Sequence, residues 1–154
     1  MRVILLAGLL ALTATLSSCR KAGDNVVTVG HGSWKVELAL DEPSRELGLA
    51  KRTTLASGSG MLFVFPRAEK STFHMLNCCV SLDVAFITDD LRVAEVRTMR
   101  VEPDPAHPQA LYGSRVAVKY ALEVPAGELE KAGVAIGQNV SFSPAVEEAA
   151  KAAR

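Results

Sequence analysis

The sequence predicts a β-rich α+β domain built on one mostly antiparallel sheet that is barrel-like or strongly curved. About seven short segments either alternate apolar and polar residues or are apolar throughout, and Gly, Pro, Asp and Asn separate most of them. Only two short segments combine a helical pattern with capping residues. The length of 154 residues suits a single domain, so strands and helices should share one fold.

The predicted strands differ in how they are covered. Segment 61–65 is apolar at every position, which predicts a central strand covered on both sides and ended by Pro66. Phe63 and Phe65 should point to one side of it and the intervening residues to the other. Segment 116–124 alternates most regularly, with Val, Tyr and Leu on one face and Ala, Lys119 and Glu123 on the other. Eight segments are candidates for the roughly seven strands, at residues 26–29, 34–40, 61–65, 71–75, 84–88, 93–99, 116–124 and 140–142.

Two short helices are expected between the strands. Asp41 can cap a helix that carries Pro43 in its first turn and continues through residues 44–49, with Gly48 inside it. A second helix covers 126–131, with a glycine just past its end. We assign 26–143 to the single β-rich domain and 144–154 to an Ala- and Glu-rich tail, helical or frayed.

The N-terminus has the pattern of an export signal. A basic residue precedes an apolar run that is shorter than the roughly 20 residues needed to span a bilayer. Leu16-Ser17-Ser18-Cys19 resembles the lipobox of bacterial lipoproteins, which implies a signal peptide over 1–18 and diacylglycerol on Cys19. Residues 19–25 would then be a lipidated tether that holds the protein at the membrane, in the cell envelope and facing the periplasm. Arg20 stands where one bacterial sorting rule places Asp for inner-membrane retention, which favours the outer membrane.

Six segments together resemble the domain of unknown function 192 family, and the resemblance extends over residues 27–142. The segments are 46–49, 60–65, 73–77, 82–87, 112–114 and 119–124. The resemblance implies a compact β-rich fold and no settled activity, and it points to the stretch around 74–77 as the functional surface. This chain departs from the family there, with His74 in place of Trp and Leu76 in place of Lys.

Residues 74–79 hold the side chains with the richest chemistry. His74, Met75, Cys78 and Cys79 could ligate a soft metal such as Cu(I) or Zn. Adjacent cysteines suit such a site poorly, because successive side chains of a strand point to opposite faces. Simple packing of the thiols and a strained vicinal disulfide are the alternatives.

Asp83 precedes an apolar strand and is the other candidate functional residue. A chain that enters a strand leaves backbone N–H groups to satisfy, so we expect this carboxylate to be buried and to accept hydrogen bonds from a turn. A general base or a metal ligand is the alternative, although catalysis normally needs a second positioned group.

Three functions follow from these residues. The first is an envelope lipoprotein whose non-catalytic domain binds a small ligand or an envelope protein through Phe73, His74, Asn77, Asp83 and Tyr112. The others are a soft-metal protein and a hydrolase centred on Asp83. We find no nucleophile elbow, phosphate loop or zinc-protease motif, so no catalytic residue is assigned. With 17 basic and 17 acidic residues the chain lacks the basic excess of nucleic-acid proteins, and we expect a monomer without a cofactor.

Replacing Cys19 by Ser tests the anchor. The Cys19→Ser protein should move from the membrane fraction to the soluble periplasmic fraction, because the acyl chains and not a spanning helix hold it. Immunoblots of fractionated cells measure this, with Cys79→Ser as the control that stays in the membrane fraction. Retention of Cys19→Ser in the membranes would contradict the lipoprotein assignment.

Overall fold

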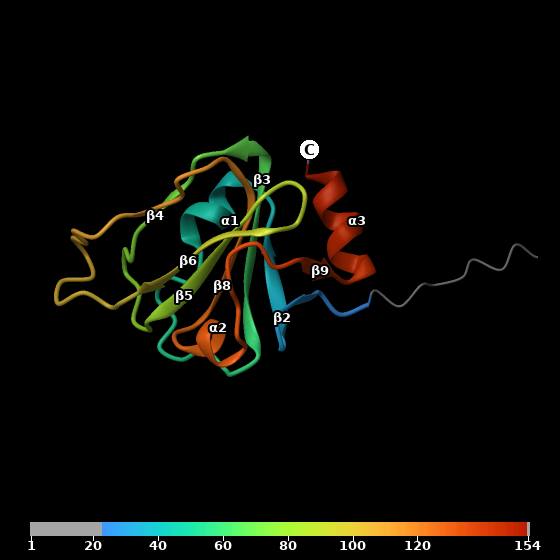
Figure 1. The fold of residues 1–154 in the computed structure, drawn as a ribbon. Coiled ribbons are helices and arrows are strands. Elements are labelled where there is room, and N and C mark those ends of the chain that lie inside the picture. The colour runs from blue at the N-terminus through green and yellow to red at the C-terminus, as the bar shows by residue number, and fades with distance from the viewer. Residues whose placement is uncertain (1–22, 154) are drawn as a thin grey trace, which may run out of the picture.

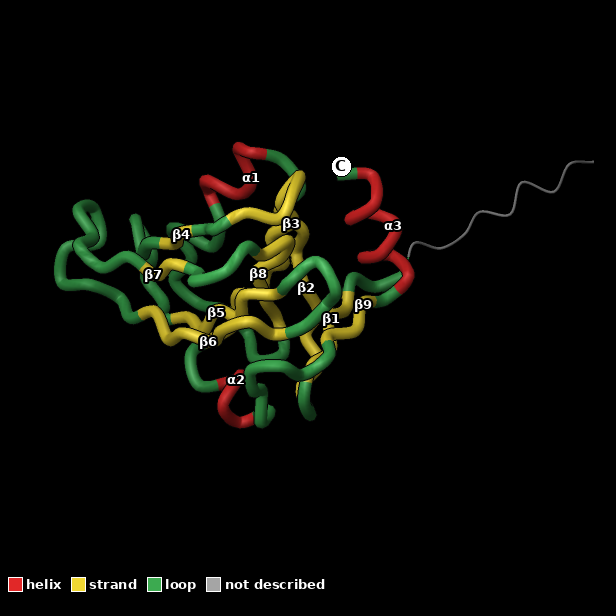
Figure 2. The backbone as a smooth tube through the Cα atoms, turned by 45° about the horizontal axis from the view of Figure 1, so that its top comes forward, coloured by secondary structure: helices red, strands yellow, loops and turns green. Residues whose placement is uncertain are grey.

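The computed structural model describes residues 23–153, so the proposed signal peptide and Cys19 lie outside the described residues. Its centre is a seven-stranded sheet with the order β6-β5-β8-β3-β2-β1-β9, and β4 and β7 form a separate two-stranded ribbon. Figures 1 and 2 show the ribbon beside the main sheet and α3 at the other side of the molecule. The strands are β1 (Val26–Val29), β2 (Gly32–Ala39), β3 (Ser59–Glu69), β4 (Thr72–Phe73), β5 (Leu82–Ile87), β6 (Val93–Met99), β7 (Tyr112–Gly113), β8 (Val118–Pro125) and β9 (Val140–Phe142).

The main sheet is mixed and curls until its two edges meet. Only β2 and β3 are parallel, joined through α1 (Glu42–Leu47), and all other neighbouring strands are antiparallel. At the edges, Arg92 and Asn139 form an isolated antiparallel bridge, and the Val93 N–H donates to the Gln138 carbonyl oxygen at 3.0 Å. The predicted class, a β-rich α+β domain with a curved, mostly antiparallel sheet, is therefore confirmed.

Each face of the sheet supports its own core. The inner core lies within the curl and contains residues of all seven strands, including Leu62 and Val64. The outer core lies on the convex face, beneath α1 and residues 72–80, and contains Phe63 and Phe65. The alternation predicted for segment 61–65 is confirmed, since these four side chains are at most 8% exposed and point to opposite sides.

The prediction that Pro66 ends the central strand is wrong. β3 continues to Glu69, but its pairing with β8 shifts register between Val64 and Glu69. Proline lacks the N–H that a regular ladder would need, and this interruption accommodates it. The buried Lys119 ammonium donates to the Pro66 carbonyl oxygen at 2.7 Å, which satisfies both groups.

Two other predicted strands are shorter than expected. Segment 71–75 reduces to the two residues of β4, because only Thr72 and Phe73 find a partner strand, in β7. Segment 116–124 becomes β8 only from Val118 onward, and Val116 is exposed. β8 lies between β3 and β5, so its second face, which carries Lys119 and Glu123, is buried as well.

The helices close the open sides of the sheet. Asp41 caps α1 as predicted, with its carboxylate accepting from the Ser44 N–H at 2.9 Å. α2 (Glu128–Lys131) covers one end of the inner core with Leu129. The segment expected as a helical or frayed tail forms α3 (Pro144–Ala152), which packs Val146 and Ala150 into the inner core. No helix within residues 23–153 has the length and apolar character needed to cross a membrane.

Candidate functional site

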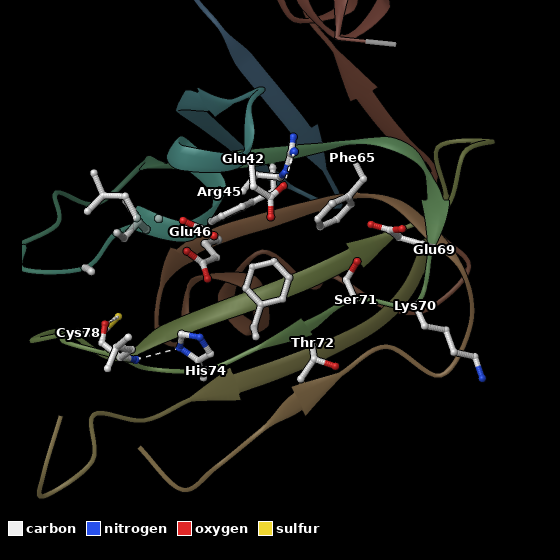
Figure 3. Close-up of a pocket in the computed structure, with 18 residues that line it drawn as sticks. Glu42, Arg45, Glu46, Phe65, Glu69, Lys70, Ser71, Thr72, His74 and Cys78 are labelled. Atoms are coloured by element: carbon white, nitrogen blue, oxygen red, sulfur yellow. Dashed lines mark hydrogen bonds and ion pairs between the residues drawn. The ribbon is translucent and has the colours of Figure 1, made fainter. Parts of the chain in front are cut away.

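A pocket of about 360 Å³ opens on the outer face of the sheet, beneath α1. This volume lies within the range typical of small-molecule sites. Figure 3 shows the pocket enclosed by α1, the end of β3 and the segment that carries β4. Its apolar lining is Leu47, Leu49, Ala50, Phe63, Phe65, Phe73 and Leu76, and its polar lining includes Arg45, Glu46, Ser71, Thr72, His74, Cys78 and Glu123.

The wall formed by α1 is held by Arg45 and Gly48. One guanidinium nitrogen of Arg45 donates to the carbonyl oxygens of Leu40 at 2.9 Å and Val64 at 3.0 Å. Gly48 ends the helix with a φ of 51°, in the region that favours glycine, and a Cβ there would lie 3.3 Å from the Phe63 ring. The wall is thus fixed to β3 and to the residue that follows β2, and it packs closely on the Phe63 ring.

Aromatic rings form the apolar part of the pocket. Phe73 packs edge-to-face on Phe63, with centroids 5.0 Å apart, and on Phe86 at 5.6 Å. Phe63 and Phe86 are almost fully buried, whereas Phe73 is half-buried. The rings therefore extend the outer core to the surface and give the pocket a rigid apolar wall.

Glu123 places a carboxyl group in this apolar setting. It lies on β8 opposite Met61 of β3 and Val84 of β5, and both neighbours belong to the outer core. The residue is 5% exposed and lines the pocket, and no residue between 23 and 153 forms a hydrogen bond or ion pair with its carboxyl group. Burial raises the pKa of the Glu123 carboxyl to about 8, so the group is mostly protonated at neutral pH.

Ser71 is the second unpartnered polar group at the pocket. Its backbone is paired with Ser114, which accepts the Ser71 N–H on its hydroxyl at 3.0 Å. The Ser71 hydroxyl itself is buried and has no hydrogen-bond partner within the described part of the chain. Buried polar groups are nearly always paired, so the Ser71 hydroxyl and the Glu123 carboxyl are both available to a partner that enters the pocket, either water or a bound molecule.

The thiols of Cys78 and Cys79 are free and differ in their surroundings. Cys79 is exposed, whereas Cys78 is buried at the pocket, where it donates to the Leu76 carbonyl oxygen at 3.7 Å. Burial, assisted by Glu123 and Cys79, raises the pKa of the Cys78 thiol to about 11. Such a thiol stays protonated at neutral pH and is a poor nucleophile or metal ligand.

The soft-metal hypothesis receives no support from this arrangement. His74 and Cys78 both line the pocket, but Met75 is fully buried in the outer core and Cys79 points to solvent. No group of three or more His, Cys, Asp or Glu side chains in residues 23–153 could hold a metal ion. The predicted ligands are therefore not assembled as a set.

Of the five residues expected to bind a ligand, Phe73 and His74 line the pocket. The other three lie outside its lining. Tyr112 pairs with Phe73 across the ribbon. Asn77 adopts a φ of 55°, and its backbone N–H donates to the Pro105 carbonyl oxygen at 2.7 Å, so it holds a loop.

Asp83 has the structural role that the sequence predicts for it. It pairs with Val124 across the ladder, so its side chain lies on the inner face, opposite that of Glu123. The carboxylate is 2% exposed and accepts from the Thr98 hydroxyl at 2.7 Å and the Gly127 N–H at 2.8 Å. It also accepts from the Leu129 N–H at 3.3 Å, which ties the start of α2 to β5. With these bonds its oxygens are occupied.

The curled sheet and the pocket beneath α1 define a small β-rich domain with a site on its convex face. The chain belongs to the DUF192 family (Uncharacterized ACR, COG1430), whose model matches residues 25–142. The resemblance found in the sequence is thereby confirmed for the domain, and Glu123 lies within the matched region. Sequence reasoning missed this residue as a site, and its only signal was that it is one of two charged residues in a mostly apolar strand.

Three relatives place the chain among similar proteins. A UPF0127 protein from Pyrococcus abyssi is 28% identical over 110 residues, which are 70% of this chain and 86% of the relative. A solved structure from Sinorhizobium meliloti 1021, named as a proposed transcription regulator, matches at 29% identity with a TM-score of 0.70, covering 79% and 95% of the two chains. A protein of unknown function from Novosphingobium aromaticivorans matches at 26% identity with a TM-score of 0.69, covering 75% and 83%.

Substituting Asn for Asp83 tests the structural role of this carboxylate. Asn keeps one acceptor but loses the charge and presents an NH₂ group to the donors, so Asp83→Asn should lower the free energy of unfolding by about 1–3 kcal/mol. Denaturant titration followed by circular dichroism measures the change. The control Asp89→Asn, at an exposed turn, should change it by less than about 0.5 kcal/mol. An equally small loss for Asp83→Asn would contradict the assignment.

Proposed function

We propose that the protein is a cell-envelope lipoprotein whose domain binds a small molecule, without catalysis, in the pocket beneath α1. The observation that carries the proposal is the pair of unpartnered polar groups, Ser71 Oγ and the Glu123 carboxyl, at a pocket walled by three phenylalanine rings. An apolar pocket with few convergent polar groups is the usual form of a small-molecule site. The lipidated Cys19 and the tether to residue 25 would keep this domain at the membrane, with the outer membrane favoured.

The chemistry of the lining supports binding over catalysis. The Cys78 thiol is held protonated by burial, so it lacks the thiolate that a nucleophile needs. The His74 ring nitrogen Nδ1 accepts the Leu76 N–H at 3.3 Å, and no described pocket residue forms a nucleophile–base hydrogen bond with it. A neutral Glu123 in a hydrophobic pocket can by itself serve as a hydrogen-bonding group for a bound molecule.

Fragment binding to the full-length protein tests this proposal. The protein is screened by NMR against several hundred neutral and charged fragments of about 15 heavy atoms or fewer. Some of these fragments should shift the signals of Phe63, Thr72 and Phe73. Ala50→Phe places a ring at the half-buried pocket wall and should weaken this binding at least about tenfold, since it fills the volume that the fragments need. Ala126→Phe, at an exposed position outside the lining, is the matched control. If no fragment shifts the pocket signals, or if Ala50→Phe leaves all binding intact, the proposal is wrong.

A further inference from the structure

We propose that the pocket takes an organic cation, an ammonium group on an apolar body, whose charge pairs with the Glu123 carboxylate while the body packs on the phenylalanine rings. This inference rests on the proposed function and goes further by assigning the class of ligand.

Burying the Glu123 carboxyl costs free energy that no described residue offsets with a hydrogen bond or an ion pair. The carboxyl group lies among Met61, Val84 and the phenylalanine rings, where most of its contact with water is removed. No cation and no hydrogen-bond donor of the described residues contacts it. The other buried acids of the described chain have partners. Asp83 accepts three hydrogen bonds, and Glu95 forms an ion pair with Arg97. Glu123 is thus an exception among the buried acids, and it faces the pocket.

The charged side chains at the pocket rim also favour a cation over an anion. Arg45 of α1 lines the pocket, but its guanidinium already donates to two backbone carbonyl oxygens and to the Glu42 carboxylate, the latter at 2.8 Å. Lys70 points away from the pocket, as Figure 3 shows. Glu46 on α1 has no ion pair in residues 23–153, and Glu69 at the end of β3 is 3.5 Å from the exposed Arg67. Apart from Glu123, the lining holds three carboxylates, of Glu42, Glu46 and Glu69, and two cations, of Arg45 and Lys70. The rim therefore carries a small excess of negative charge, which attracts a cation and repels an anion.

The walls of the pocket suit an ammonium group on an apolar body. The faces of aromatic rings carry negative partial charge, so phenylalanine walls stabilise a nearby ammonium as well as an apolar body. The unpartnered Ser71 hydroxyl offers a further acceptor for an ammonium N–H. A neutral apolar ligand would satisfy neither this hydroxyl nor the carboxyl group of Glu123.

Binding of a cation must release a proton. The empty pocket holds Glu123 as a neutral acid, and an incoming ammonium stabilises the carboxylate, so the carboxyl proton passes to the buffer. The other titratable or charged groups around the pocket that Glu123 lines are Glu42, Arg45 and Glu46 on α1, Glu69 on β3, Lys70 just after β3, Lys119 on β8, and His74, Cys78 and Cys79 in the segment after β4. Of these, the Cys78 thiol stays neutral throughout this pH range.

A matched set of three phenyl compounds tests the ligand class on the full-length protein. The compounds are 2-phenylethylamine, 2-phenylethanol and 3-phenylpropanoate, which differ mainly in charge, and titration calorimetry measures their affinities between pH 6 and 8. With a Glu123 pKa of about 8, the affinity for the amine should rise roughly 50-fold from pH 6 to 8, because only the ionised acid pairs with it. Calorimetry in buffers of different ionisation enthalpy should show close to one proton released per amine at pH 7.

Two variants separate Glu123 from the rest of the pocket. Glu123→Gln keeps the shape, and it should weaken amine binding at pH 8 at least about tenfold and make it nearly independent of pH. His74→Gln removes the imidazole, the other group in this lining that could titrate between pH 6 and 8, and should leave the rise of amine affinity with pH unchanged. Tighter binding of 2-phenylethanol or 3-phenylpropanoate than of the amine, or an amine affinity that does not rise with pH, overturns the cation assignment but leaves the pocket as a binding site. Absence of binding by all three compounds overturns both proposals.

Discussion

The burial of β8 on both faces is the constraint on which the rest of this structure depends. Residues 118–124 lie between β3 and β5 with the inner core on one side and the outer core on the other, so a polar side chain there has little access to water. The Lys119 ammonium has a hydrogen-bond partner, the Pro66 carbonyl oxygen, at the position where the pairing of β3 with β8 is interrupted. Glu123 does not, and its carboxyl faces the pocket instead. The strand that contributes to both cores thus also carries Glu123, whose carboxyl group has no partner among the described residues.

The parallel pairing of β2 and β3 explains why the pocket lies where it does. A parallel connection must cross over the sheet, and here the crossover carries α1 across the convex face. Arg45 then fixes the helix to the backbone of β3 at Val64 and to Leu40, the residue after β2. The pocket lies between this fixed helix and the phenylalanine rings. Rigid walls of this kind reduce the ordering that a ligand must impose when it binds.

The sequence predicted those features that depend on local pattern. The faces of segment 61–65, the Asp41 cap and the hydrogen bonds of Asp83 all follow from period, capping preference and the need to satisfy backbone groups. The pocket could not be predicted, because it combines α1, Phe63, Phe73 and Glu123, which lie up to about 80 positions apart along the chain. Alternation marked the face of Lys119 and Glu123 as the polar one, but it cannot tell whether a polar face is exposed or covered.

The central claim is that Glu123 is an unpaired, neutral acid in the folded protein. An acid whose pKa is raised by folding stabilises the folded state fully below its unfolded pKa, and that stabilisation is lost as the pH rises through the folded value. Carbon-13 NMR of the Glu123 carboxyl, assigned by comparison with Glu123→Gln, measures this pKa directly in the ligand-free protein. The structure predicts a value of about 8, whereas a value near the ordinary 4.5 would show that the carboxyl is solvated or paired and would contradict the account.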